Sequence, residues 1–297
     1  MKILECVPNF SEGRDETKVE RIVEEVRRTP GVKLLDYFSD QDHNRTVVTF
    51  LGEPGPVREA AREASLKALE LIDMRTHRGG HPRIGAVDVV PFVPIRGMDL
   101  SETAHIAREM GRDLGKAGQV PIYFYGEAAT DPKRKKLADI RKGEYERLEE
   151  KLATPGWEPD AGSSVFNPKS GAVVVGARMP LIAFNVNLRP SKLEPARLIA
   201  RKIRESSGGI PSVQAIGLEL REKGMVQVSM NLTDYRRASI PRVVEAIRRE
   251  AAGKGLEIAE CEIVGLVPLE ALVDVVRQSL KMPEFDMKQM IETHLLE

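Results

Sequence analysis

One order of apolar segments occurs twice along this chain, and it limits the folds that the chain can adopt. In the first half, the periodicity predicts a strand at 2–7, a helix at 15–28, strands at 32–38 and 46–51, a helix at 54–73 and a strand at 87–95. In the second half, it predicts a strand at 181–188, a helix at 194–205, strands at 213–220 and 225–232, a helix at 240–252 and a strand at 256–264.

The repeated order β-α-β-β-α-β is typical of ferredoxin-like units, in which helices cover one face of an antiparallel sheet. We therefore predict an α+β protein with two ferredoxin-like subdomains, residues 1–178 and 179–297. Because each sheet would keep one uncovered apolar face, we expect the two sheets to face each other. The other predicted elements are a helix from near Asp99, strands at 120–125 and 172–177, a charged, helix-permissive segment at 131–152, a long loop at 155–171, and helices at 269–280 and 286–296.

Composition limits the compartment and the partners. Lys plus Arg equals Asp plus Glu at 45 each, and aromatic residues make up 5%. Single-stranded RNA-binding modules of similar fold need a basic face and exposed aromatics, so we expect no nucleic-acid partner. No apolar run approaches the roughly 20 residues of a membrane span. Two cysteines form no disulfide framework, so we expect a cytoplasmic protein without a membrane partner.

The stretch 72–86 reads IDMRTHRGGHPRIGA and carries the first candidate for catalysis. Its glycines and proline exclude a continuous helix, so His81 lies on a loop, where an imidazole can transfer protons near neutral pH. A purely structural histidine is the alternative. His77 lies four residues before His81, a spacing known from metal ligands on helices, but the broken helix predicts no metal site.

Other polar residues could support the same chemistry. Asp42, His43 and Arg45 cluster just before a predicted strand, although turn formation alone could explain the aspartate. Asn9 follows the first strand and could line a site or cap a helix. Arg83 could hold a carboxylate in a bidentate manner, although exposure to solvent is the commoner role of an arginine.

Six segments, taken together, resemble the formiminotransferase family. They are ECVPNFSEG (5–13), DHNRTVVTFLG (42–52), IDMRTHRGGHPRIGAVDVVPFVP (72–94), IYFYGEAA (122–129), IRKGEYE (140–146) and LIAFNVNL (181–188). The resemblance implies that residues 1–178 and 179–297 are the N-terminal and C-terminal formiminotransferase subdomains, with a folate tunnel between them.

The resemblance also implies a reaction: transfer of the formimino group from N-formimino-L-glutamate to tetrahydrofolate, in histidine degradation. The products would be 5-formimidoyltetrahydrofolate and L-glutamate, with His81 as general acid and base. A related transfer of a formyl group between formylglutamate and tetrahydrofolate is the alternative. The family also implies a homodimer. That no metal cofactor is expected follows from the broken helix between His77 and His81.

In the family a loop between two glycines contacts folate. The corresponding residues here are Gly162, Ser163, Ser164, Val165, Phe166, Asn167, Pro168, Lys169, Ser170 and Gly171. A further folate contact corresponds to about Lys202, in the first helix of the second unit.

Overall fold

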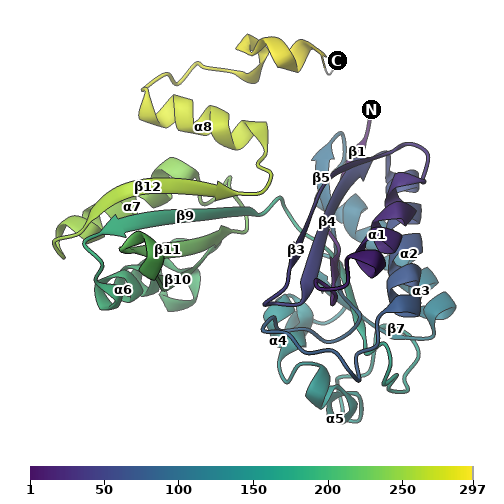
Figure 1. The fold of residues 1–297 in the computed structure, drawn as a ribbon. Helices are drawn as coiled ribbons and strands as arrows, with labels where there is room; N and C mark the ends of the chain where they lie inside the picture. Colours follow the sequence, from purple (N-terminus) through teal and green to yellow (C-terminus); the bar gives the residue numbers. More distant parts are fainter. Residues whose placement is uncertain (296–297) are drawn as a thin grey trace. The chain divides into compact units, whose positions relative to one another are not determined.

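The computed structural model describes residues 1–295, and the chain divides into two compact units, Met1–Arg178 and Met179–Glu297. Among the described residues, the first unit has an eight-stranded sheet and the second a four-stranded sheet, each with its own core (Figure 1). The predicted fold class, mixed α and β with two sheet-containing subdomains, is confirmed. That the two sheets face each other stays a prediction.

The first unit begins with the predicted β-α-β-β-α-β pattern. Its elements are β1 (Ile3–Cys6), β2 (Asn9–Phe10), α1 (Glu16–Arg27), β3 (Val32–Asp40), β4 (Arg45–Gly52), α2 (Pro54–Leu71) and β5 (Val87–Arg96). The predicted first strand is shorter than expected and resumes as β2 after Pro8, which has no N–H for the ladder. Both pieces lie between β4 and β5, and all these pairings are antiparallel.

Helices α1 and α2 cover one face of this sheet (Figure 1). In α1, the Asp15 side chain accepts a hydrogen bond from the backbone N–H of Lys18 and so begins the helix. The apolar side chains of α1 recur at helical spacing and are buried in the core; they are Val19, Ile22, Val23 and Val26. The opposite face of the sheet is left for polar residues and for a later segment of the chain.

Three further strands extend the first sheet, and one further helix belongs to the same unit. They are α3 (Leu100–Gly118), β6 (Pro121–Gly126), β7 (Ala161–Gly162) and β8 (Val173–Ala177). The last of them, β8, lies between β5 and β6 and runs parallel to both, while β7 pairs antiparallel with the outer edge of β6. The helix expected from near Asp99 and the strands expected at 120–125 and 172–177 are therefore confirmed, whereas β7 lies in the segment predicted as a long loop.

The charged segment at 131–152 is broken into short pieces. They are 3-10 turns at Pro132–Arg134 and Tyr145–Arg147, and the helices α4 (Leu137–Arg141) and α5 (Leu148–Leu152). Gly143 and Glu144 have φ of 91° and 54°, which no right-handed helix accommodates. The segment packs on the sheet face opposite the main core, where Ile140 and Leu148 join Tyr123 in a separate apolar cluster. This packing brings α4 over the beginning of β5.

The second unit has the predicted order. Its elements are β9 (Ile182–Arg189), α6 (Leu193–Ile203), a 3-10 turn (Glu205–Ser207), β10 (Val213–Leu220), a 3-10 turn (Arg221–Lys223), β11 (Met225–Leu232), α7 (Ile240–Ala252) and β12 (Glu257–Val264). The antiparallel sheet order β10-β11-β9-β12 is that of a ferredoxin-like unit.

The end of the chain differs from the prediction. The helix expected at 269–280 is confirmed as α8 (Leu269–Ser279). The helix expected at 286–296 is wrong over the described residues, which form short 3-10 turns at Met287–Gln289 and Ile291–Leu295. Met290 is extended (φ −92°, ψ 126°) and separates the two turns. Residue 296, the end of that expected helix, lies outside the described part.

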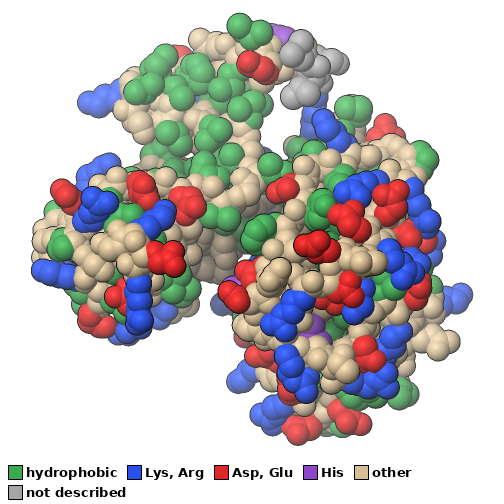
Figure 2. All heavy atoms as spheres, in the orientation of Figure 1, with side chains coloured by type: hydrophobic (Ala, Val, Ile, Leu, Met, Phe, Trp, Pro, Cys, Tyr) green, Lys and Arg blue, Asp and Glu red, His purple; other side chains and the backbone are tan. Residues whose placement is uncertain are grey.

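The visible surface carries both signs of charge side by side (Figure 2). This mixture agrees with equal numbers of acidic and basic residues in the chain. Over residues 1–295, no helix combines the length and the apolar character needed to cross a membrane.

Candidate active site

A loop rich in glycine, residues 72–86, connects α2 to β5; we call it the glycine loop. Its middle packs backbone to backbone on the turn between β3 and β4. The N–H of Gly80 donates to the carbonyl of Asp42 (3.2 Å), and a Cβ at Gly79 would lie only 2.2 Å from the carbonyl oxygen of His43. The glycine at 79 is therefore required by close approach, in addition to breaking the helix.

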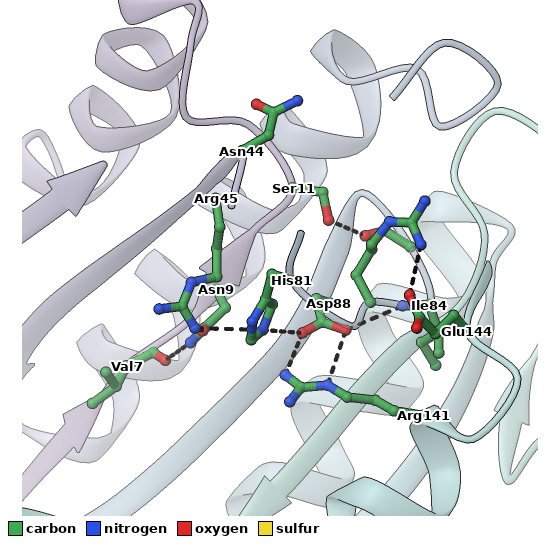
Figure 3. A network of polar contacts seen from close by, with 12 residues as sticks. Val7, Asn9, Ser11, Asn44, Arg45, His81, Ile84, Asp88, Arg141 and Glu144 are labelled. Carbon is green, nitrogen blue, oxygen red and sulfur yellow. Dashed lines mark hydrogen bonds and ion pairs between the residues drawn. The ribbon is translucent and has the colours of Figure 1, made fainter. Parts of the chain in front are cut away.

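His81 projects from the glycine loop between a cation and a carboxylate (Figure 3). Its Nε2 lies 3.4 Å from Nη1 of Arg45 and 3.8 Å from Oδ2 of Asp88. The His43 ring meets the His81 ring edge to face, with centroids 6.3 Å apart. The His81 side chain is 18% exposed, so a substrate can reach it while most of it is shielded from water.

Asp88 and Arg141 are site residues that the sequence analysis missed. Asp88 lies at the start of β5, and its Oδ1 accepts a hydrogen bond from the N–H of Ile84 (3.1 Å). The Arg141 guanidinium, from α4, donates through Nε to Oδ1 (3.3 Å) and through Nη2 to Oδ2. A lone carboxylate inside an otherwise apolar strand was a usable signal for Asp88, whereas Arg141 lies among many other cations.

The surroundings of His81 keep its imidazole neutral. Burial is the largest cause, and the nearby Arg45 and Arg141 add to it; together with His43 and Arg83 they lower the pKa of His81 to about 3. A guanidinium at 3.4 Å fits this state, because the Nε2 lone pair of a neutral imidazole accepts a hydrogen bond from Arg45. The site thus holds an unprotonated base among cations.

Arg45 is incompletely satisfied by the protein. Its Nη1 donates to Oδ1 of Asn9 (3.2 Å), and the Asn9 amide is oriented by its own bond to the carbonyl of Val7 (3.0 Å). Within the described residues, Nε of Arg45 is buried and has no hydrogen-bond partner. Burial, reinforced by Arg141, lowers the pKa of Arg45. Such a cation is suited to an anionic ligand.

Two further candidates, Asp42 and His43, lie in the turn between β3 and β4 and differ in how they face this site. His43 is 51% exposed, and its Nδ1 lies 2.6 Å from Oδ2 of Asp40. Asp42 is exposed, and its backbone carbonyl holds the N–H of Gly80. His43 therefore lies at the rim of the site, while Asp42 supports the glycine loop through its backbone.

Arg83 is buried and engaged by the protein. Its guanidinium donates to Oε2 of Glu144 (2.9 Å) and, through both terminal nitrogens, to the carboxylate of Glu146 (2.6 and 2.9 Å). These bonds tie the glycine loop to the broken segment that contains α4. They favour a supporting role for Arg83 over direct substrate binding.

His77 does not join His81 as a pair of ligands. Its Nε2 donates to the carbonyl of Asn44 (3.0 Å), and its Nδ1 accepts from Nε of Arg83 (3.3 Å). Both ring nitrogens of His77 are thus engaged. In residues 1–295, no group of three or more His, Cys, Asp or Glu side chains is arranged to hold a metal ion.

Segment 162–171 is joined to both ends of the glycine loop. The carbonyl of Lys169 accepts from the N–H of Met74 (2.8 Å), and the carbonyl of Ser170 accepts from the N–H of Ala86 (2.8 Å). These two bonds clamp the base of the glycine loop, so the segment predicted to contact folate lies beside the loop that carries His81.

The free part of segment 162–171 has exposed and aromatic side chains. Phe166 packs on Tyr145 with centroids 5.8 Å apart. The Val165 side chain is 72% exposed. Behind them, Oδ1 of Asn167 accepts from the N–H groups of Lys169 and Ser170 (3.1 Å each) and holds the turn. The segment therefore presents a surface on a fixed base.

Lys202 belongs to the other unit, near the end of α6. Its Nζ lies 2.7 Å from Oε1 of Glu250, and its side chain is 67% exposed. An exposed ion pair of this kind is worth little energy, so the lysine can exchange its partner for a ligand at low cost.

Comparison with known proteins shows the family of this chain. One family model, "Formiminotransferase domain, N-terminal subdomain", matches residues 3–178, and a second, "Formiminotransferase domain", matches residues 183–293. The chain belongs to the formiminotransferase family, and it is therefore a group-transferring enzyme. The resemblance seen in the sequence is confirmed.

Individual relatives give a narrower class. The chain is 43% identical to "Glutamate formimidoyltransferase" of Streptococcus pyogenes, covering 99% of both proteins. It is 45% identical to the protein of the same name from Thermoplasma acidophilum, covering 98% of this chain and 97% of the relative. It is also 47% identical to "Formimidoyltransferase-cyclodeaminase" of Rattus norvegicus, covering 92% of this chain and 51% of that protein.

Proposed function

We propose that this enzyme transfers the formimino group of N-formimino-L-glutamate to tetrahydrofolate, with His81 as general acid and base. The products are 5-formimidoyltetrahydrofolate and L-glutamate. The names of the full-length relatives support the reaction. The observation that carries the residue assignment is the neutral, partly shielded His81 next to the incompletely satisfied Arg45.

The chemistry requires one proton to move between two nitrogens. N5 of tetrahydrofolate attacks the formimino carbon, and a new C–N bond gives a tetrahedral intermediate. His81 takes the proton from N5 and returns it to the glutamate nitrogen, so that the old C–N bond breaks and glutamate leaves as an amine. A neutral imidazole is the form needed for the first of these steps.

The direct test supplies purified enzyme with each donor separately. With formiminoglutamate, release of L-glutamate should require tetrahydrofolate and continue after treatment with a chelator, because we propose no metal. Formylglutamate, assayed in parallel, tests transfer of a formyl group. Glutamate release that is independent of tetrahydrofolate would contradict the proposal.

Arg45 is proposed to bind a carboxylate of formiminoglutamate. Arg45→Met should raise the KM for this substrate by about 10- to 100-fold, because a hydrogen bond to a charged group contributes roughly 1.5–3 kcal/mol. Steady-state kinetics at saturating tetrahydrofolate measure the effect. Arg14→Met is the control, since Arg14 is exposed and its Nε donates to the carbonyl of Gln41. Equal KM values for the two variants would exclude the assignment.

Segment 162–171 is proposed to contact tetrahydrofolate, with Lys202 as a further contact. Val165→Asp should raise the KM for tetrahydrofolate by about 5- to 20-fold and change kcat less, because it replaces an apolar contact worth roughly 1–2 kcal/mol. Ile95→Asp, 45% exposed at the far end of β5, is the control. A fall in kcat at constant KM would argue against folate contact here.

The remaining features of the proposal follow from the family and, for the compartment, from the sequence composition. We propose that residues 1–178 and 179–297 act as the two formiminotransferase subdomains and that the enzyme is a cytoplasmic homodimer. Light scattering at assay concentrations measures the molecular mass in solution. The mass of a monomer would contradict the proposed dimer.

A further inference from the structure

The strongest unexplained feature near His81 is the buried charge of Asp88. Its side chain is 1% exposed and lies in a strand of apolar residues. Placing a carboxylate there is costly unless it is paired and hydrogen-bonded, and Arg141 together with the N–H of Ile84 meets that need. The protein thus maintains an ion pair directly behind His81.

The hydrogen bond that Asp88 accepts from the N–H of Ile84 does not by itself require a charged side chain. An asparagine at position 88 could accept the same N–H through its amide oxygen. What an asparagine would lack is the negative charge that faces Nε2 of His81 at 3.8 Å. That distance exceeds a hydrogen bond, so the carboxylate acts on a protonated His81 through its charge.

Charged and titratable groups face His81 from every element packed around it. They are Arg45 from β4, His43 from the turn before β4, Arg141 from α4, Arg83 from the glycine loop and Asp88 from β5. Four of the five are cationic or become so on protonation. Asp88 is the carboxylate that offsets them.

We propose that Asp88 and Arg141 are positioning residues for proton transfer at His81. Asp88 holds the glycine loop and stabilises the imidazolium that forms when His81 takes the proton. Arg141 fixes Asp88 and, as a nearby cation, limits how readily His81 is protonated. This proposal rests on the acid–base role of His81 given under Proposed function.

The same unit contains a matched control pair. Asp160 and Arg134 are 5% and 7% exposed, with Oδ1 and Nη1 2.7 Å apart. Oδ2 of Asp160 also accepts a backbone N–H, from Phe124 (2.8 Å). Substitutions in this pair remove a buried ion pair away from His81, so they report the effect of lost stability.

The first experiment is an NMR titration of the His81 imidazole, which does not depend on turnover. Arg141→Gln should raise the pKa of His81 from its value of about 3 by at least one unit, because a neighbouring cation is lost. Adding Asp88→Asn to the Arg141→Gln variant should lower the pKa of His81 again, because the neighbouring negative charge is then lost as well. Arg134→Gln and Asp160→Asn should leave it unchanged.

The second experiment measures kcat against pH for Asp88→Asn. We expect kcat to fall at least 10-fold, both KM values to stay within about 3-fold of wild type, and the acidic limb to move to lower pH. Asp160→Asn should keep the wild-type limb. If Asp88→Asn does not fold, the titration of Arg141→Gln still tests the proposal. An unchanged pKa of His81 in that variant overturns it.

The outcomes separate this proposal from the reaction itself. A titration that is insensitive to both residues, or equally sensitive to the control pair, overturns the positioning role even if His81 proves essential. A titration that shifts as expected while kcat of Asp88→Asn stays at wild type supports the electrostatic pairing but overturns the role of Asp88 in proton transfer. The His81 variants then test the acid–base role of His81 separately.

Discussion

Replacing His81 with alanine should lower kcat by about 10²- to 10⁴-fold. A positioned acid–base group contributes this much, about 3 to 5 kcal/mol of barrier, and acts in the transition state. The KM for tetrahydrofolate should change little, because the proposed folate contacts lie on segment 162–171. His81→Asn keeps much of the shape but cannot transfer the proton, so it should fail to a similar extent in initial-rate assays.

The matched control is His105→Asn. His105 is 69% exposed on α3 and interacts only with Glu109 in the described structure (3.4 Å), so its replacement should leave kcat unchanged. If His81→Asn kept more than about a tenth of the wild-type turnover, the proton carrier would be another group. His43 at the rim, or Asp42, would then have to be tested.

The pH dependence should differ between the two kinetic parameters. In the free protein His81 has a pKa of about 3, so it is neutral at every ordinary assay pH, and kcat/KM should show no imidazole limb near pH ~6.5. Substrate carboxylates near Arg45 would offset the cations and raise this pKa in the complex. The acidic limb of kcat should therefore lie at higher pH, and His81→Asn should abolish it.

Replacing Gly79 with alanine should both destabilise the fold and lower activity. The new Cβ would lie 2.2 Å from the carbonyl oxygen of His43 and 2.8 Å from Cβ of Asn44, so the glycine loop must move away. Overpacking of this kind costs about 1–3 kcal/mol, or roughly 2–10 °C in the melting temperature. A shift of about 1 Å at His81 can slow turnover by up to about 10²-fold.

The neighbouring glycine is an internal control. A Cβ at Gly80 would meet its nearest atoms at 3.8 and 4.0 Å, which is ordinary contact, so Gly80→Ala should keep the wild-type melting temperature and kcat. Calorimetry and initial rates on both variants measure the contrast. Equal behaviour of the two variants would show that the backbone contact at Gly79 does not shape the site.

Local sequence patterns predict where the helices and strands of this fold lie better than they predict which strands pair in the sheet. Helical spacing gives α1 and strand alternation gives β4 within one or two residues, because each buries one face on a nearby core. No local pattern shows that β8 enters the first sheet beside β5, since that pairing joins segments about 80 residues apart. The order of elements is therefore readable, while the extension of the sheet is not.

The same limit applies to the site. His81 is conspicuous because glycine and proline place it on a loop, and Arg45 lies in a polar cluster of its own. Arg141 lies in one of the six segments that carry the resemblance, 140–146, but nothing local shows its role, because that role depends on how α4 folds back over β5. The bonds from Arg83 to Glu144 and Glu146 have the same origin, since these two glutamates are more than 60 residues away.

The position of β8 has a consequence for how the enzyme is made. This strand is the last of the first unit to be synthesised, yet it fills the place between β5 and β6. A nascent chain that has not reached Val173 therefore exposes two unpaired strand edges, and until Lys169 and Ser170 emerge its glycine loop lacks their bonds. The site around His81 can assemble only after nearly the whole first unit has left the ribosome, so we expect truncated products to be both inactive and prone to aggregate.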